Sequence, residues 1–145
     1  MNKQCVLERY KELKSKIIRR CSQFEKLMEF VESETNWLTA PASTKYHLCE
    51  EGGLLEHSVN VAETILKLKS AIYPDATDES CVIVALLHDL GKVGMPNNPQ
   101  YIANEPTEKQ KRYGYKPEYP YRFNNNLTYL SVPVRSIYLS MKFID

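Results

Sequence analysis

Hydrophobic residues recur at helical spacing through the N-terminal quarter of the chain. They follow one another at steps of three and four, at Val6, Tyr10, Leu13, Ile17, Cys21, Phe24, Met28 and Val31. Such steps keep side chains on one face of an α-helix. The pattern predicts one long amphipathic helix from about residue 4 to 34, in an N-terminal segment, residues 1–35, that packs on the rest of the domain.

The pattern then breaks and resumes in two further segments. Residues 36–53 contain a proline, a Ser/Thr cluster and a Gly pair, which predict a loop. From Leu54 the apolar face is wide, which predicts a well-buried helix that ends near Ser70. The run CVIVALL within residues 78–90 could by itself be a buried strand, but the capping residues TDES before it and Gly91 after it favour a helix.

The last third of the chain is rich in tyrosine and proline. Residues 94–131 hold five prolines and six of the ten tyrosines, and they predict a long, ordered loop with a helical turn around residues 107–112. After it, Pro133 at a first-turn position and helically spaced apolar residues predict a final helix. The expected fold class is all-α: a helical bundle with a long Tyr/Pro-rich loop.

Composition narrows the function classes. A chain of 145 residues with 43% hydrophobic residues suits one domain with its own core. Lys and Arg number 19 against 18 for Asp and Glu, so no overall charge attracts nucleic acid or a membrane. The sequence shows neither a signal peptide nor a membrane-spanning run, and its four cysteines form no CxxC pair, so a cytoplasmic protein with reduced thiols is expected.

A histidine and an aspartate occupy the end of the most apolar segment. His88 and Asp89 follow CVIVALL directly, and His57 lies three residues after Leu54 and four before Val61, on an apolar helix face. Taken singly, such a histidine is more often a hydrogen-bonded core residue, and an isolated HD pair means little. Together they favour a metal site, because imidazole nitrogen and carboxylate oxygen suit Mn, Fe, Ni, Zn or Mg.

Two blocks of sequence resemble a known family. GGLLEHSVNVA at residues 52–62 and ALLHDLGKVG at residues 85–94 resemble the HD-domain metal-dependent phosphohydrolases. The resemblance implies an all-helical HD-type domain. It also implies a divalent metal ion held by His57, His88 and Asp89, and hydrolysis of a nucleotide or another phosphate ester.

The resemblance extends to two candidate catalytic residues. Lys92 matches the lysine after HDxG, which implies a place near the phosphate, where its charge would stabilise the transition state. The alternative is a solvated cation at a helix end. His47, within YHLCEEGG, matches an upstream histidine of several relatives, which implies contact with the substrate or with a metal-bound water. In its protonated form it could assist the leaving group.

The family pattern also requires an aspartate on a later helix. After Asp89 the only aspartate is Asp145, the last residue of the sequence. We therefore expect residues 1–145 to form a single, incomplete HD-type domain with reduced metal affinity and turnover. This reduction is expected unless Asp145, a glutamate such as Glu105 or Glu118, water or another chain completes the set of metal ligands.

Two functions outside hydrolysis stay open. The chain could be a catalytically impaired HD scaffold that binds metal, nucleotide or a protein partner. Alternatively, residues 108–123, in which cations alternate with aromatic residues, could contact nucleic acid, although the balanced total charge disfavours this. The exposed edge of the final helix suggests self-association.

Overall fold

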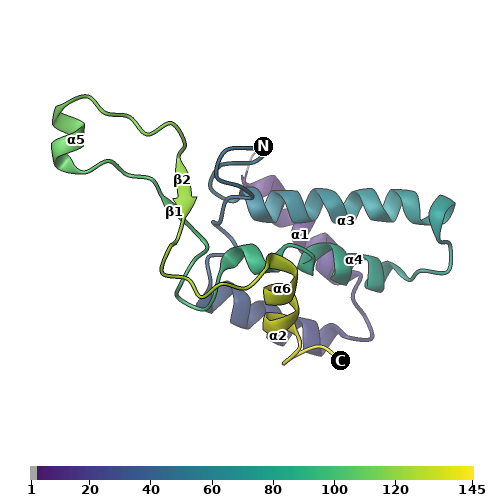
Figure 1. Ribbon diagram of the computed structural model, residues 1–145. Coiled ribbons are helices and arrows are strands. Elements are labelled where there is room, and N and C mark those ends of the chain that lie inside the picture. The colour runs from purple at the N-terminus through teal and green to yellow at the C-terminus, as the bar shows by residue number, and fades with distance from the viewer. Residues whose placement is uncertain (1–2) are drawn as a thin grey trace.

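The computed structural model describes residues 3–145, and helices make up most of it (Figure 1). The elements are α1 (Lys3–Ser15), α2 (Cys21–Glu34), α3 (Gly53–Ile72), α4 (Asp78–Leu87), the 3₁₀ helix η1 (Leu90–Val93), β1 (Tyr101–Ala103), α5 (Glu108–Arg112), β2 (Tyr121–Phe123) and α6 (Val132–Ser140). The expected helical fold is confirmed, with one small antiparallel sheet added. The first two residues of the predicted N-terminal segment lie outside the described part.

The single long helix predicted from residue 4 to 34 is wrong, because the chain turns between α1 and α2. The cause is Glu79, a buried residue in the first turn of α4. Its carboxylate accepts hydrogen bonds from the backbone N–H groups of Ile18 at 3.2 Å, Arg19 at 2.9 Å and Arg20 at 2.8 Å. These bonds replace the helical ones that the turn gives up. Both helices face the same core, so the apolar spacing continues across the break.

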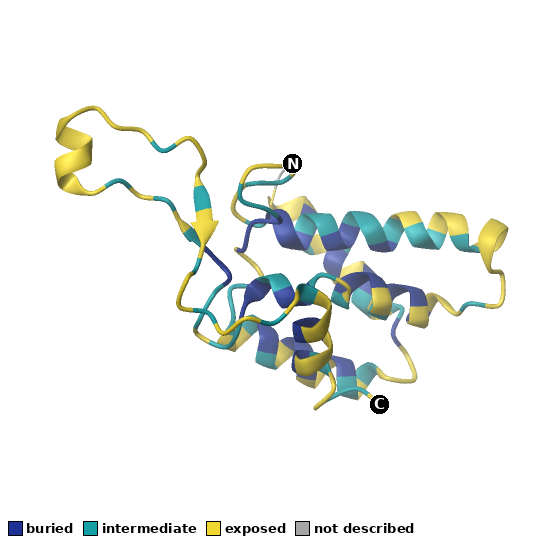
Figure 2. Cartoon of the chain, in the orientation of Figure 1, coloured by how far each residue is buried: buried dark blue, intermediate teal, exposed yellow. Residues whose placement is uncertain are grey.

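The core lies between the first four helices. α3 packs along α4, and α1 packs against α3 (Figure 1). The inner faces are buried while the outer faces are exposed, as Figure 2 shows. The largest fully buried side chains include Trp37, Phe24, Leu27, Leu54, Leu86 and Leu90. Trp37 comes from the irregular segment before α3, so that predicted loop also contributes to the core.

The segment CVIVALL is helical, as its caps indicate. Thr77 is the N-cap of α4, and its side chain accepts a hydrogen bond from Ser80 N–H. The helix ends at Leu87, earlier than predicted, and the chain continues into η1. Gly91 lies inside η1, where an added Cβ would collide with Val132 O of α6. Close approach of another helix, rather than helix termination, is therefore the reason for this glycine.

The Tyr/Pro-rich segment forms an arm that projects from the helices (Figure 1). At its base, β1 pairs antiparallel with β2, with Tyr101 opposite Phe123. α5 lies at the far end, on the helical turn that the sequence predicts. Thr107 and Gln110 form a capping box there. Figure 2 shows that most of the arm is exposed, although Tyr101 of β1, at its base, is buried.

The Glu79 contact predicts a pH-dependent stability. Hydrogen bonds from the three backbone N–H groups hold the pKa of Glu79 below its ordinary value of 4.5. Its stabilising effect is therefore present at neutral pH and is lost as the pH falls below 4.5 through the folded-state pKa. We expect Glu79→Gln to lower the melting temperature at neutral pH, and to differ less from wild type in acid. Thermal unfolding followed by circular dichroism tests this.

Glu105→Gln is the matched control, because Glu105 is an exposed residue of the arm. It should melt like wild type at both pH values. Equal melting temperatures for Glu79→Gln and Glu105→Gln at neutral pH would contradict the capping role of Glu79.

Candidate metal centre

Three side chains from two helix ends meet at one point. His57 lies in the second turn of α3, His88 is the C-cap of α4, and Asp89 follows it directly. The two histidine Nε2 atoms are 3.3 Å apart. Asp89 Oδ2 lies 3.3 Å from His57 Nε2 and 3.4 Å from His88 Nε2. Within residues 3–145 this is the group whose ligand atoms, all within 4.8 Å of one another, could hold one metal ion.

The orientation of His88 is fixed by a backbone hydrogen bond. Its Nδ1 lies 2.6 Å from Ala85 O, one turn earlier in α4. A carbonyl can only accept, so Nδ1 carries a proton, and a neutral His88 ring would present the lone pair of Nε2 to the cluster. Metal-binding histidines are commonly fixed in this way by a bond from the second nitrogen. The donor set and its orientation fit a divalent ion.

Asp89 stays ionised although it is half-buried. Burial alone would raise the pKa of Asp89, but hydrogen bonds from His88 and Lys92 outweigh it and hold that pKa far below its ordinary value. Lys92 Nζ lies 2.7 Å from Asp89 Oδ2. The carboxylate is thus available as an anionic ligand, and a metal ion would compete with Lys92 and protonated His88 for it.

The two histidines of the cluster differ in basicity. Burial lowers the pKa of His57, and the nearby His88, Lys92 and His47 lower it further against the attraction of Asp89. A hydrogen bond with Asp89 raises the pKa of His88. Protonation therefore competes with metal binding more strongly at His88 than at His57.

α6 holds the turn that follows the metal cluster. Gly91 N–H donates to Ser136 Oγ at 2.7 Å, and Arg135 Nη1 donates to Gly91 O at 2.6 Å. Ser136 Oγ also donates to His88 O at 3.3 Å. The sequence predicted this helix but not its role. The two polar residues inside the apolar segment VPVRSIYL could have indicated that this helix makes buried polar contacts.

The loop before α3 brings His47 near the cluster but not into it. His47 is exposed and is not one of the three clustered ligands, yet its charge acts on His57. Gly53, in the first turn of α3, contacts the loop so closely that a Cβ would collide with Leu48 O. This contact explains Gly53, whereas the left-handed backbone at the N-cap of α3, with φ +84°, explains Gly52. Lys45 of the same loop lies 5.5 Å from the Tyr119 ring, which connects the loop to the arm.

The carboxylates proposed to complete the metal ligands are not in the cluster. Asp145 Oδ2 accepts a hydrogen bond from Gln23 of α2 at 3.1 Å. Glu105 and Glu118 are exposed residues of the arm and lie outside the group that could hold a metal ion. Within residues 3–145 the cluster offers three candidate protein ligands, and catalytic zinc sites typically have three protein ligands and one open position.

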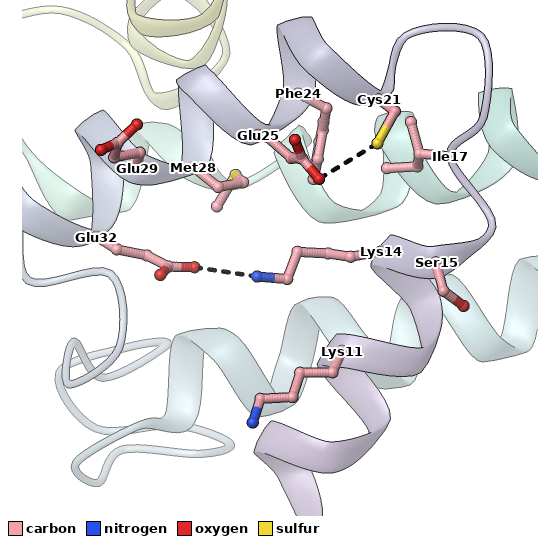
Figure 3. Close-up of a pocket in the computed structure, with 10 residues that line it drawn as sticks. All are labelled: Lys11, Lys14, Ser15, Ile17, Cys21, Phe24, Glu25, Met28, Glu29 and Glu32. Atoms are coloured by element: carbon pink, nitrogen blue, oxygen red, sulfur yellow. Dashed lines mark hydrogen bonds and ion pairs between the residues drawn. The ribbon is translucent and has the colours of Figure 1, made fainter.

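Two cavities differ in their relation to the cluster. One of about 480 Å³ lies between α1 and α2, where Lys14 Nζ faces Glu32 at 3.5 Å across a floor that includes Phe24 and Met28 (Figure 3). It contains none of the metal-binding candidates. A second, of about 470 Å³, lies between α4 and α6 and includes His88 in a mostly apolar wall. Only the second is adjacent to the metal cluster.

The pKa shifts predict the result of replacing Asp89. In metal-free protein, Asp89→Asn should lower the pKa of His88, because the raising hydrogen bond is lost. The three histidines make this measurable by proton NMR titration in the presence of a chelator. Asp75→Asn, in the exposed turn before α4, is the control and should leave His88 unchanged. An unchanged His88 titration in Asp89→Asn would contradict the contact.

No helix within residues 3–145 is long and apolar enough to cross a membrane. Neither the curated proteins nor the solved structures compared with the chain gave a match. The family model described as HD domain matches residues 54–119, a range that includes all three clustered ligands and Lys92 but not His47. The resemblance seen in the sequence is confirmed as a match of residues 54–119 to the HD domain.

Proposed function

We propose that the protein is a metal-dependent phosphohydrolase whose substrate is a nucleotide or another small phosphate ester. The observation that supports this most is the convergence of His57, His88 and Asp89 within 4.8 Å, in the segment that matches the HD domain. A divalent ion bound there would polarise a phosphoryl oxygen and activate water. Mn, Fe, Ni, Zn and Mg all remain candidates, and Mg suits two imidazoles least.

The anionic and neutral ligands of the cluster and the cationic Lys92 would have different roles in the reaction. His57, His88 and Asp89 would hold the ion, and the bond from His88 to Ala85 O would keep the His88 ring oriented. Lys92, freed from Asp89 by the incoming metal charge, would turn toward the phosphate and offset the negative charge that develops in the transition state. An arrangement in which Lys92 only neutralises Asp89 is the alternative.

His47 would act on the leaving group. It lies near enough to His57 to lower the pKa of that residue, and it is exposed on a loop that can approach a bound ester. In its protonated form it can donate a proton to a departing oxygen. His47→Ala should then slow hydrolysis of esters with poor leaving groups more than of those with good ones.

The proposal predicts two different classes of variant. Asp89→Ala should lose both bound metal and hydrolysis, whereas Lys92→Met should keep the metal and lower kcat by about 100-fold. Elemental analysis and a screen of nucleotides and phosphate esters with added Mn or Ni measure both properties. Asp75→Ala is the matched control, because it removes an aspartate from an exposed turn.

The outcomes separate the rival functions. Metal content and hydrolysis that survive in Asp89→Ala would show that the site is assigned wrongly. A wild-type protein that holds metal but hydrolyses no compound of the screen would favour the catalytically impaired HD scaffold. Self-association through exposed apolar residues of α6 and its C-cap, among them Ile137 and Met141, stays a prediction that sedimentation can test.

Contact with single-stranded nucleic acid is a second candidate function, favoured by the arm. Tyr113 and Tyr115 are 82% and 51% exposed beside α5, where bases could stack on them. Residues 108–116 combine them with four cations and one carboxylate. The exposed tyrosines and the local positive charge, rather than the total charge, support this candidate.

The arm predicts salt-sensitive binding to a single-stranded oligonucleotide. The double variant Lys111→Ala/Arg112→Ala should lose retention on the oligonucleotide, since two phosphate contacts disappear. The double variant Lys26→Ala/Lys67→Ala removes two exposed cations from α2 and α3 and should bind like wild type. Equal loss in both variants would leave only nonspecific charge attraction and contradict a role for the arm.

A further inference from the structure

Arg135 is a buried cation without a carboxylate partner. Its side chain is in the first turns of α6, and the residue is 3% exposed. The guanidinium donates to Gly91 O at 2.6 Å, to Gln100 Oε1 at 2.5 Å and to Leu130 O at 2.9 Å, all of them neutral acceptors. The ion pairs among residues 3–145 do not include it. A buried charge without a counter-ion is costly.

Two details distinguish Arg135 from a fully satisfied structural arginine. Its Nε is buried and has no hydrogen-bond partner among the described residues. Arg9, by contrast, shares a bidentate pair with Glu63, with bonds of 2.8 and 2.6 Å. Burial lowers the pKa of Arg135, but a guanidinium stays protonated in proteins, so the charge is still present.

A cavity of about 390 Å³ adjoins Arg135, between the loop after β2 and the start of α6. Its wall includes the polar side chains of Gln100, Asn125, Thr128 and Ser131 and contains no acidic residue. Ser131 is the N-cap of α6, and its side chain makes no capping hydrogen bond. The first-turn N–H groups of this nine-residue helix, at Val132 and Val134, therefore lack both an intrahelical acceptor and a side-chain cap.

We propose that this cavity binds a phosphate group or a similar tetrahedral oxyanion. The positive end of α6, the Arg135 guanidinium and the side chains of Asn125, Thr128 and Ser131 together supply charge and donors of the kind that such an anion requires. The anion is either free in solution or the phosphate of a larger ligand. The cavity contains none of the three clustered metal ligands, so it is separate from the proposed catalytic centre.

The test uses a change that fills the site with a fixed negative charge. In chelator-treated wild-type protein, inorganic phosphate should raise the melting temperature in a saturable way over chloride of equal ionic strength. Ser131→Asp places a carboxylate at the N-cap of α6, beside Arg135. This variant should melt higher than wild type without phosphate and should lose the phosphate-dependent rise.

Asn126→Asp is the matched control, because it adds the same charge at an exposed residue that does not line the cavity. It should keep the phosphate-dependent rise. A wild-type melting temperature that phosphate does not change, or an equal rise in Ser131→Asp and Asn126→Asp, would overturn the proposal.

NMR then locates the anion and distinguishes its source. Inorganic phosphate should shift the amide signals of Val132 and Val134 in wild type but not in Ser131→Asp. Adenosine monophosphate added in its place should act at a lower concentration if the cavity receives the phosphate of a larger ligand. It should act no better than inorganic phosphate if the ligand is the free ion. Amide shifts confined to the segment around His57 and His88 would contradict this location.

Discussion

The close contact between Gly91 and α6 is the constraint on which the rest of the site depends. Gly91 lies where a Cβ would collide with Val132 O. Its N–H donates a hydrogen bond to Ser136 Oγ, and its carbonyl accepts one from Arg135. His88 and Asp89 come directly before this turn, which the contacts with α6 hold in place. Their positions relative to α3, and hence to His57, therefore depend on a helix that begins more than forty residues later.

The turn around Gly91 lies between two regions that would bind ions of opposite charge. On one side, Asp89 is surrounded by Lys92 and two histidines, so the centre has more donors and cations than one carboxylate can satisfy. On the other side, Arg135 has a charge without a counter-ion. Metal binding would displace cations from Asp89, and anion binding would neutralise Arg135.

The sequence predicted the parts of the fold that depend on local spacing. α3 and α4 follow their apolar faces and caps, and the metal-binding candidates His57, His88 and Asp89 lie together because both helix ends meet there. The break between α1 and α2 could not be predicted, since it depends on a carboxylate of α4 some sixty residues away. Asp145, one of the groups that could have completed the metal ligands, contacts Gln23 of α2 instead, and a spacing pattern does not indicate which helix such a residue contacts.

The central claim is that His57, His88 and Asp89 form one metal centre, and the ligands of the bound ion test it most directly. X-ray absorption at the metal edge, on chelator-treated protein reloaded with one equivalent of Ni or Zn, reports those ligands. The expected spectrum contains the outer-shell scattering of two imidazole rings together with oxygen ligands. A spectrum with oxygen ligands alone, or with sulfur from the cysteines, would contradict the assignment.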